Sequence, residues 1–189
     1  MAGELGSKLG GNRSKVSLVH KPNGKLGAVR ISYRSDSGRH EIEINKAHSN
    51  IGVGKSGKVP MLTSHRDNHK IVYDFGLYKN MIKGGGTYYT SVDDEGIEMT
   101  PSIKSLIARS EIVSEMLSHA ARFASDGTSE LSSSAAKEFT LILSGAAKSE
   151  EAFASELNNI LNIELSGSGF DLRSRLERSK KSFAALKKL

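Results

Sequence analysis

The sequence predicts an α+β protein, in which an N-terminal antiparallel β-sheet or small barrel is followed by a C-terminal bundle of about four helices. Two observations predict this class. As far as residue 99, several stretches alternate apolar with polar residues, as strands with one exposed face do. Beyond residue 100, apolar residues recur every three or four positions, as along one side of a helix. We divide the chain into a flexible basic arm (1–15), an antiparallel β domain (16–99) and a helical domain (100–189).

The β domain opens with three alternating stretches, which are separated by the sequences KPNGK and SDSG. Both separators are rich in the residues that tight turns between strands require. We therefore expect a three-strand antiparallel meander made of VSLVH (16–20), LGAVRISYR (26–34) and HEIEIN (40–45). Three further strands are expected later in the domain: KIVYDFGLY (70–78), TYYTSV (87–92) and IEM (97–99).

The change to helices is expected at Thr100 and Pro101. Threonine is a good N-cap, and proline suits the first helical position. The first helix should end near Asp126-Gly127, and Ser144-Gly145 should separate the second helix from the third. The three later helices are expected at about 132–143, 150–165 and 170–189.

The loop SNIGVGKSGK (49–58) imitates a phosphate-binding loop. Such a loop needs Gly, four residues and then Gly-Lys-Ser/Thr, and it leads from a buried parallel strand into a helix. In one register Val59 replaces the hydroxyl residue, and in the other Ser49 replaces the first glycine. Neither neighbouring segment has the required pattern, so we expect no nucleotide-hydrolysing site. Two interpretations remain: a loop that touches phosphates through Lys55 and Lys58, or a plain exposed turn.

The remaining motifs do not predict an enzyme, a metal or a cofactor. His65-Arg66-Asp67 and Asp74-Phe75-Gly76 imitate kinase motifs, but they lie too close together. His65 and His69 have the spacing of two zinc ligands, although zinc needs a third, for which His48 or Asp67 would have to serve. The chain has no cysteine and so offers no thiolate. We expect no catalytic activity; an effector or enzyme with a site near His65 is an alternative.

The sequence carries no export or membrane signal that we can identify. The first 15 residues lack the apolar core of a Sec-type signal peptide. Apolar runs stay shorter than the ~18–20 residues that a membrane span needs. We therefore expect a cytoplasmic protein, or one inside a virion or another large assembly.

Positive charge is concentrated at the two ends of the chain. Residues 1–34 contain seven Lys or Arg and one Glu, and so do residues 172–189, which gives each segment a net charge of +6. The whole chain also has a net charge of +6, so the middle is acidic by 6 charges. Basic ends are typical of proteins that bind nucleic acid, an anionic membrane or the acidic surface of a neighbouring subunit. Solvated tails are the simplest alternative.

The last segment, FDLRSRLERSKKSFAALKKL, predicts a basic amphipathic helix. Its apolar residues lie broadly along one side, and seven cations surround them. Three interpretations are open: the helix closes the bundle, docks on a partner subunit, or lies on an anionic membrane. The absence of tryptophan from the chain disfavours the membrane.

Together these features predict a non-enzymatic, self-assembling nucleic-acid-binding protein of the nucleocapsid-like or single-strand-coating kind. Cations beside exposed aromatic rings on a sheet bind single strands, and contacts to phosphates depend little on sequence. Arg30 and Arg34 are an even number of residues apart, so on one strand their side chains should lie on the same face. The alternative is a shell, tube or filament subunit that assembles without nucleic acid. The expected nucleic-acid-binding residues are Lys8, Arg13, Lys15, Lys21, Lys25, Arg30, Tyr33, Arg34, Lys55, Lys58, Tyr88, Tyr89, Arg173, Arg175, Arg178, Lys180 and Lys181.

Overall fold

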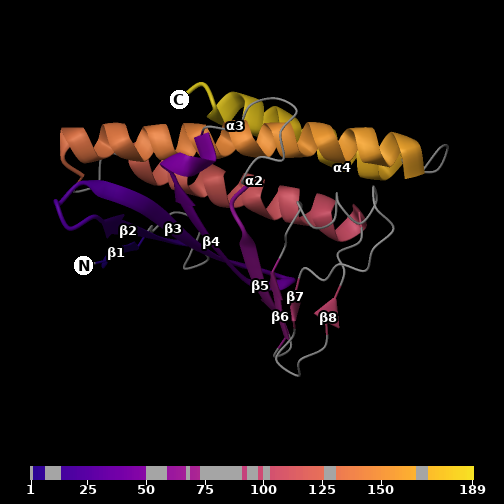
Figure 1. The fold of residues 1–189 in the computed structure, drawn as a ribbon, viewed down its shortest axis with the longest axis horizontal. Coiled ribbons are helices and arrows are strands. Elements are labelled where there is room, and N and C mark those ends of the chain that lie inside the picture. The colour runs from indigo at the N-terminus through magenta and orange to yellow at the C-terminus, as the bar shows by residue number, and fades with distance from the viewer. Residues whose placement is uncertain are drawn as a thin grey trace.

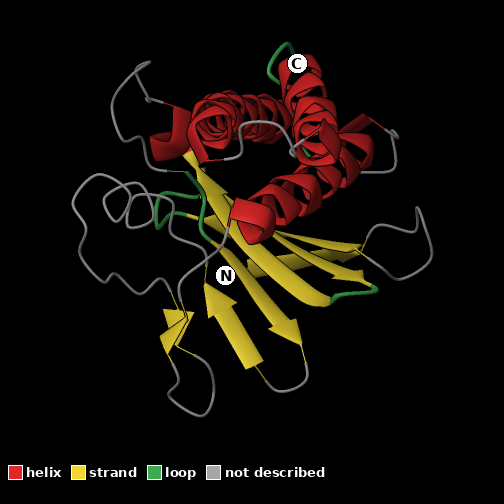
Figure 2. Cartoon of the chain, turned by 90° about the vertical axis from the view of Figure 1, so that its right-hand side faces the viewer, coloured by secondary structure: helices red, strands yellow, loops and turns green. Residues whose placement is uncertain are grey.

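The fold combines an antiparallel sheet with a layer of helices on one of its faces (Figure 1). The computed structural model describes residues 2–6, 14–49, 59–66, 69–72, 91–92, 98–99, 103–125, 131–164 and 170–189. Within these residues a six-stranded sheet precedes three helices along the chain, which confirms the predicted α+β class. Figure 2 shows the helices on one side of the sheet, while the opposite face carries none of them.

The six strands of the main sheet lie in sequence order, and every neighbouring pair is antiparallel. The predicted three-strand meander is confirmed as its centre. The strands are β1 (Ala2–Gly6), β2 (Ser14–His20), β3 (Leu26–Ser35), β4 (Gly38–Asn45), β5 (Leu62–Arg66) and β6 (His69–Val72). A short 3-10 helix, η1 (Lys46–Ser49), follows β4. A second sheet pairs β7 (Ser91–Val92) with β8 (Glu98–Met99).

Two strands of the main sheet were not expected from the sequence. Residues 2–6 were assigned to a flexible arm, but β1 pairs with β2 along its whole length. β5 was missed because its sequence, LTSHR, has only one strongly apolar residue, Leu62. Both segments join the sheet through backbone hydrogen bonds, which need no apolar alternation. Of the predicted strand 70–78, only the part in β6 lies within the described residues.

The turn between β2 and β3 depends on Gly24. Its φ angle is 79°, in the left-handed region that side chains other than glycine rarely adopt. The backbone N–H of Gly24 donates to the carbonyl of Lys21 at 2.9 Å, and the side-chain Oδ1 of Asn23 accepts from the N–H of Lys25 at 3.1 Å. These bonds close the turn and set the register of the hairpin.

Replacing Gly24 with alanine is expected to lower the free energy of unfolding by about 1 kcal/mol. The cause is backbone strain alone, because a Cβ atom at this position would meet no heavy atom within 4 Å. Urea unfolding followed by circular dichroism would measure the change. Gly24→Asn is the matched control and should lose less, because asparagine tolerates positive φ better than alanine. Equal losses for both variants would contradict the strain argument.

Three helices form the C-terminal half of the described chain: α2 (Ile103–Ser125), α3 (Ser133–Glu164) and α4 (Phe170–Leu186). The expected break at Ser144-Gly145 is wrong, since α3 continues through it and replaces two predicted helices. The reason is burial: Gly145, Ala146 and Ala147 lie inside the protein, so packing outweighs the weak helix propensity of glycine. Ser149, directly before the predicted start of the third helix, lies within α3, and its Oγ donates to the carbonyl of Gly145 at 3.1 Å.

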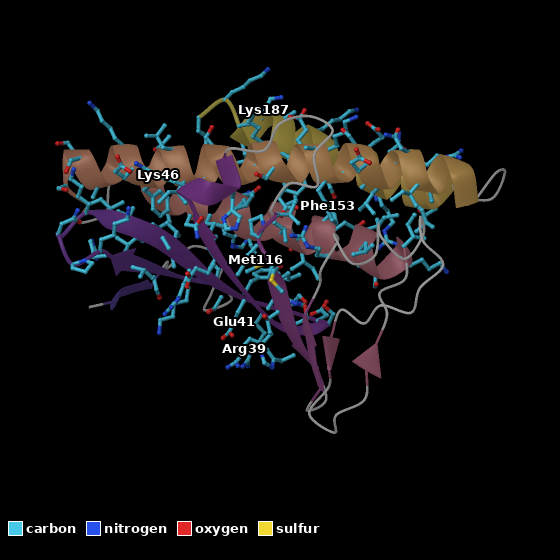
Figure 3. The ribbon with its side chains drawn as sticks, in the orientation of Figure 1. Arg39, Glu41, Lys46, Met116, Phe153 and Lys187 are labelled. Atoms are coloured by element: carbon cyan, nitrogen blue, oxygen red, sulfur yellow. The ribbon has the colours of Figure 1, made fainter. Side chains whose placement is uncertain are left out.

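Apolar residues of both halves of the chain pack into shared cores. Ile31 and Ile44 of the sheet belong to the same buried cluster as Met116 of α2 and Phe139 of α3. Figure 3 shows Met116 between the helices and the sheet. A second cluster, which includes Phe153 of α3, packs the three helices together. Leu172, Leu176 and Phe183 of α4 belong to these clusters, so α4 closes the bundle as the first interpretation predicted.

One fully buried ion pair joins α2, α3 and the segment before β5. Two nitrogens of the Arg109 guanidinium donate to the two carboxylate oxygens of Glu150, at 2.5 and 2.7 Å. The guanidinium also donates to the backbone carbonyl of Pro60 and lies 4.5 Å from the centre of the Phe153 ring. The side chains of Arg109 and Glu150 are 1% and 0% exposed. The pair therefore fixes the entry of β5 against the helices.

None of the helices in the described part of the chain combines the length and apolarity that a membrane span requires.

Candidate nucleic-acid interface

The sheet face that points away from the helices, which we call the outer face, carries the described Lys, Arg and Glu side chains of β2, β3 and β4. Lys15, Arg30, Arg34 and Arg39 alternate with buried residues on β2, β3 and β4, and all four are exposed. Figure 3 shows Arg39 on the side of the sheet opposite the helix layer. The predicted placement of Arg30 and Arg34 on one face is therefore confirmed.

One cross-strand row of the outer face brings two arginines, a histidine and a lysine position together. Arg34 of β3 is the direct partner of Arg39 on β4, and Arg39 is the partner of His65 on β5. His65 is in turn the direct cross-strand partner of Lys70 on β6. We call these four positions the basic row. Like charges directly opposite each other destabilise a sheet unless an opposite charge lies nearby.

The carboxylates on the outer face form ion pairs with some of its cations and not with others. Arg30 is opposite Glu43, and its Nε donates to Oε2 of Glu43 at 2.5 Å, so this pair is neutralised. In the basic row, Glu41 alone approaches the described side chains, at 3.6 Å from Arg39 and 3.9 Å from His65. Among the described residues, no carboxylate forms an ion pair with Arg34. Near the turn between β3 and β4, the described charged side chains of β3 and β4 on the outer face are therefore two arginines and one carboxylate, Glu41.

The structure separates several of the predicted binding residues from this row. Lys21 and Lys25 are exposed in the turn between β2 and β3. Eight residues of β3 separate this turn from Arg34, which corresponds to about 27 Å of strand. The cations of α4 lie in the helix layer, away from the outer face (Figure 1). One flat surface therefore does not contain all the predicted cations.

Among the α4 cations, Arg175 takes part in an ion pair within the helix layer. Its Nε and Nη2 donate to the two carboxylate oxygens of Glu111 on α2, at 2.7 and 2.9 Å. This hydrogen bonding raises the pKa of Arg175. Arg178 and Lys181 are exposed, whereas Arg173 and Lys180 are half-buried. The predicted residues Lys8, Arg13, Lys55, Lys58, Tyr88 and Tyr89 lie outside the described residues.

The expected exposure of Tyr33 is wrong. Tyr33 is 8% exposed and lies on the inner face of β3, under α2. Its hydroxyl donates to Glu115, and its ring is stacked on His40 and edge-on to His119. Parity gives the physical reason: if Arg30 and Arg34 point outward, Tyr33 must point inward. Tyr33 therefore offers no surface for stacking bases.

Sequence reasoning missed Arg39 and His65 as members of the same surface. A signal for Arg39 is present, because the hairpin sequence RSDSGR places Arg34 and Arg39 symmetrically about the turn. Symmetric positions across a tight turn are cross-strand partners. For His65, no comparable signal exists, because β5 follows a long segment whose length does not set the register with β4.

The two histidines near Tyr33 are held in a poorly solvated site. His40 is 2% exposed; its Nδ1 is 2.7 Å from Ser64 Oγ and its Nε2 is 2.8 Å from Ser35 Oγ. Burial lowers the pKa of His40, and the nearby Glu115 partly opposes this. Burial also lowers the pKa of His119, with a further lowering by Arg122. The neutral form of both rings is therefore favoured in the folded protein.

These two histidines are expected to make the folded protein less stable as the pH falls below about 6.5, their ordinary pKa. In this range the unfolded chain takes up protons at both rings before the folded chain does, so acid favours unfolding. Urea unfolding at about pH 7.5 and about pH 5.5 would measure the difference. His119→Gln should reduce the loss between these two values. An unchanged difference in this variant would contradict a contribution from His119.

No family model, curated protein or solved structure matches the chain.

Proposed function

We propose that the protein is a non-enzymatic, self-assembling protein that binds nucleic acid, and that the basic row on the outer face contacts the phosphate backbone. The observation that supports this proposal is the direct opposition of Arg34 and Arg39 across two strands. Such an arrangement costs stability in the free protein and becomes favourable when an anion lies between the two guanidinium groups. Arginine also binds phosphate through two parallel hydrogen bonds, which lysine does not.

The size of the row favours a chain of phosphates over a single small anion. Four neighbouring strands span about 14 Å, because strands lie roughly 4.8 Å apart. Lys15 and Arg30 extend the same face towards the edge of the sheet. With Tyr33 buried, the outer face offers charge without a described aromatic platform. We therefore propose contacts that are largely independent of sequence, as expected when phosphates rather than bases are bound.

Self-assembly is the second part of the proposal. The charge pattern permits contact between copies, because the basic ends of one chain complement the acidic middle of another.

The test is size-exclusion chromatography with light scattering and absorbance at two wavelengths, at ~0.1 M and ~1 M salt. Nucleic acid that copurifies at low salt and is lost at high salt would support binding through phosphates. The mass that remains at high salt would report self-association. A nucleic-acid-free assembly of the same size at both salts would contradict the proposal and favour a purely structural subunit.

A further inference from the structure

A pocket on the helix side of the molecule is surrounded by lysines. It has a volume of about 570 Å³ and lies between η1, the middle of α3 and the end of α4. Lys46, Lys148, Lys187 and Lys188 line it together with Leu141. We call this site the lysine pocket. Figure 3 shows Lys187 on the side of the helix layer that points away from the sheet, and Arg39 beyond the opposite side of the sheet, so the pocket is separate from the basic row.

Hydrogen bonds and ion pairs hold the pocket walls in place. Ser144 Oγ on α3 donates to the backbone carbonyl of Lys187 at 2.7 Å, which ties the end of α4 to α3. Lys187 pairs with Glu151 at 2.5 Å. Lys46 pairs with Glu138, also at 2.5 Å. These contacts make the pocket a fixed feature of the helix layer.

Two lysines of the pocket keep their charge available. Lys148 and Lys188 are exposed, and neither forms an ion pair with a carboxylate of the described residues. Lys148 lies on α3 and Lys188 on the segment after α4, and both line the same pocket. The pocket therefore presents at least two positive charges that an external anion would complement.

Leu141, an apolar residue of the lining, distinguishes this pocket from a purely ionic one. The described residues include three large apolar side chains that are strongly exposed, and Leu141 is one of them. Leu189, another of the three, directly follows Lys188. Nucleic-acid phosphates do not require exposed leucines, whereas the surface of an anionic bilayer offers both phosphates and acyl chains. Charge and apolarity together favour the bilayer.

We propose that the lysine pocket binds the surface of an anionic phospholipid membrane, with Lys148 and Lys188 at the headgroup phosphates and Leu141 and Leu189 at the acyl boundary. This activity goes beyond the proposed nucleic-acid binding. It also differs from the membrane interpretation of α4 in the sequence, because the apolar side of α4 is buried in the bundle: Leu172, Leu176 and Phe183 are between 0% and 8% exposed.

The test is cosedimentation of the full chain, freed of nucleic acid at high salt, with two kinds of vesicle. One kind contains phosphatidylcholine alone, and the other contains phosphatidylcholine mixed with phosphatidylglycerol. The protein is expected to bind only the anionic vesicles. Each lysine near an anionic membrane contributes about fivefold in affinity. The double variant Lys148→Glu/Lys188→Glu should therefore bind at least about 25-fold more weakly.

The matched control is Lys104→Glu/Arg122→Glu, which makes the same change of net charge at two exposed cations outside the pocket. It should keep most of the vesicle affinity. Leu141→Ser should weaken vesicle binding while leaving the charge unchanged. Circular dichroism would confirm that each variant is folded.

Three results would overturn the proposal. The first is no binding of the wild-type chain to anionic vesicles. The second is an equal loss in the pocket variant and the control, which would reduce the effect to net charge. The third is a pocket variant that loses oligonucleotide affinity and keeps vesicle affinity, which would assign the pocket to nucleic acid. If the chain binds anionic vesicles but no oligonucleotide, the membrane proposal for the lysine pocket is supported, and the proposed nucleic-acid binding is contradicted.

Discussion

Replacing Glu150 with alanine is expected to reduce the free energy of unfolding by about 3–5 kcal/mol. The variant would leave the Arg109 guanidinium buried, at 1% exposure, without the carboxylate that accepts two of its hydrogen bonds. The backbone carbonyl of Pro60 and the Phe153 ring do not carry the negative charge that would replace it. Loss of stability on this scale is a large fraction of the total for a domain of this size. Urea unfolding at neutral pH would measure it.

A matched control is available in the pair between Arg175 and Glu111. Its geometry is also bidentate, but its side chains are 28% and 33% exposed. Glu111→Ala should cost at most about 1 kcal/mol, because solvent screens an exposed pair. A second variant, Arg109→Met/Glu150→Met, should recover much of the loss, because it buries no unpaired charge. A Glu150→Ala variant as stable as the wild type would contradict burial of the pair.

The double variant Arg34→Ala/Arg39→Ala is expected to bind single-stranded oligonucleotides at least about tenfold more weakly, because two charge-assisted hydrogen-bonding groups are lost. Its salt dependence should also change. The slope of log affinity against log salt should be smaller by about 1.4, since each neutralised phosphate contributes roughly 0.7 on a single strand. Fluorescence anisotropy between ~50 and ~200 mM salt would measure both quantities.

The same variant should be at least as stable as the wild type when no nucleic acid is present. Removing two like charges that face each other across β3 and β4 should add about 0.2–1 kcal/mol, which offsets the loss of the exposed pair between Arg39 and Glu41. Weaker binding together with undiminished stability is the result that a damaged fold would not give. The control Lys104→Ala/Lys137→Ala removes two exposed charges from α2 and α3 and should change neither property. Equal loss of affinity in this control would contradict a site on the outer face.

The meander could be predicted from the sequence because local signals agree there. In β2, β3 and β4 the alternation, the turn residues and the strand lengths all indicate one arrangement. The continuity of α3 could not be predicted, because Gly145 is a local sign of a helix end and its burial is decided by distant residues. Of the strands predicted in the second half of the β domain, 70–78 and 87–92 lie mostly outside the described residues, whereas Glu98 and Met99 of the predicted strand 97–99 form β8.

The candidate site was predictable only in part, for a similar reason. Parity along β3 places Arg30 and Arg34 together, but the partners across the sheet depend on register. The buried pair of Arg109 and Glu150 was invisible, because charged residues on a helix usually indicate its solvent side. The lysine pocket joins Lys46, Lys148 and Lys188 from three separate segments. The packing of both η1 and α4 on α3 brings them together.

The continuity of α3 has a consequence for how the protein opens. Its 32 residues extend over about 48 Å, at 1.5 Å per residue. Phe139 packs into the cluster shared with the sheet, whereas Phe153, four turns later, packs into the cluster between the helices. Partial opening of either core would have to break the helix or carry the other core with it. The amide hydrogens between these two residues should therefore exchange with solvent more slowly than those at either end of α3.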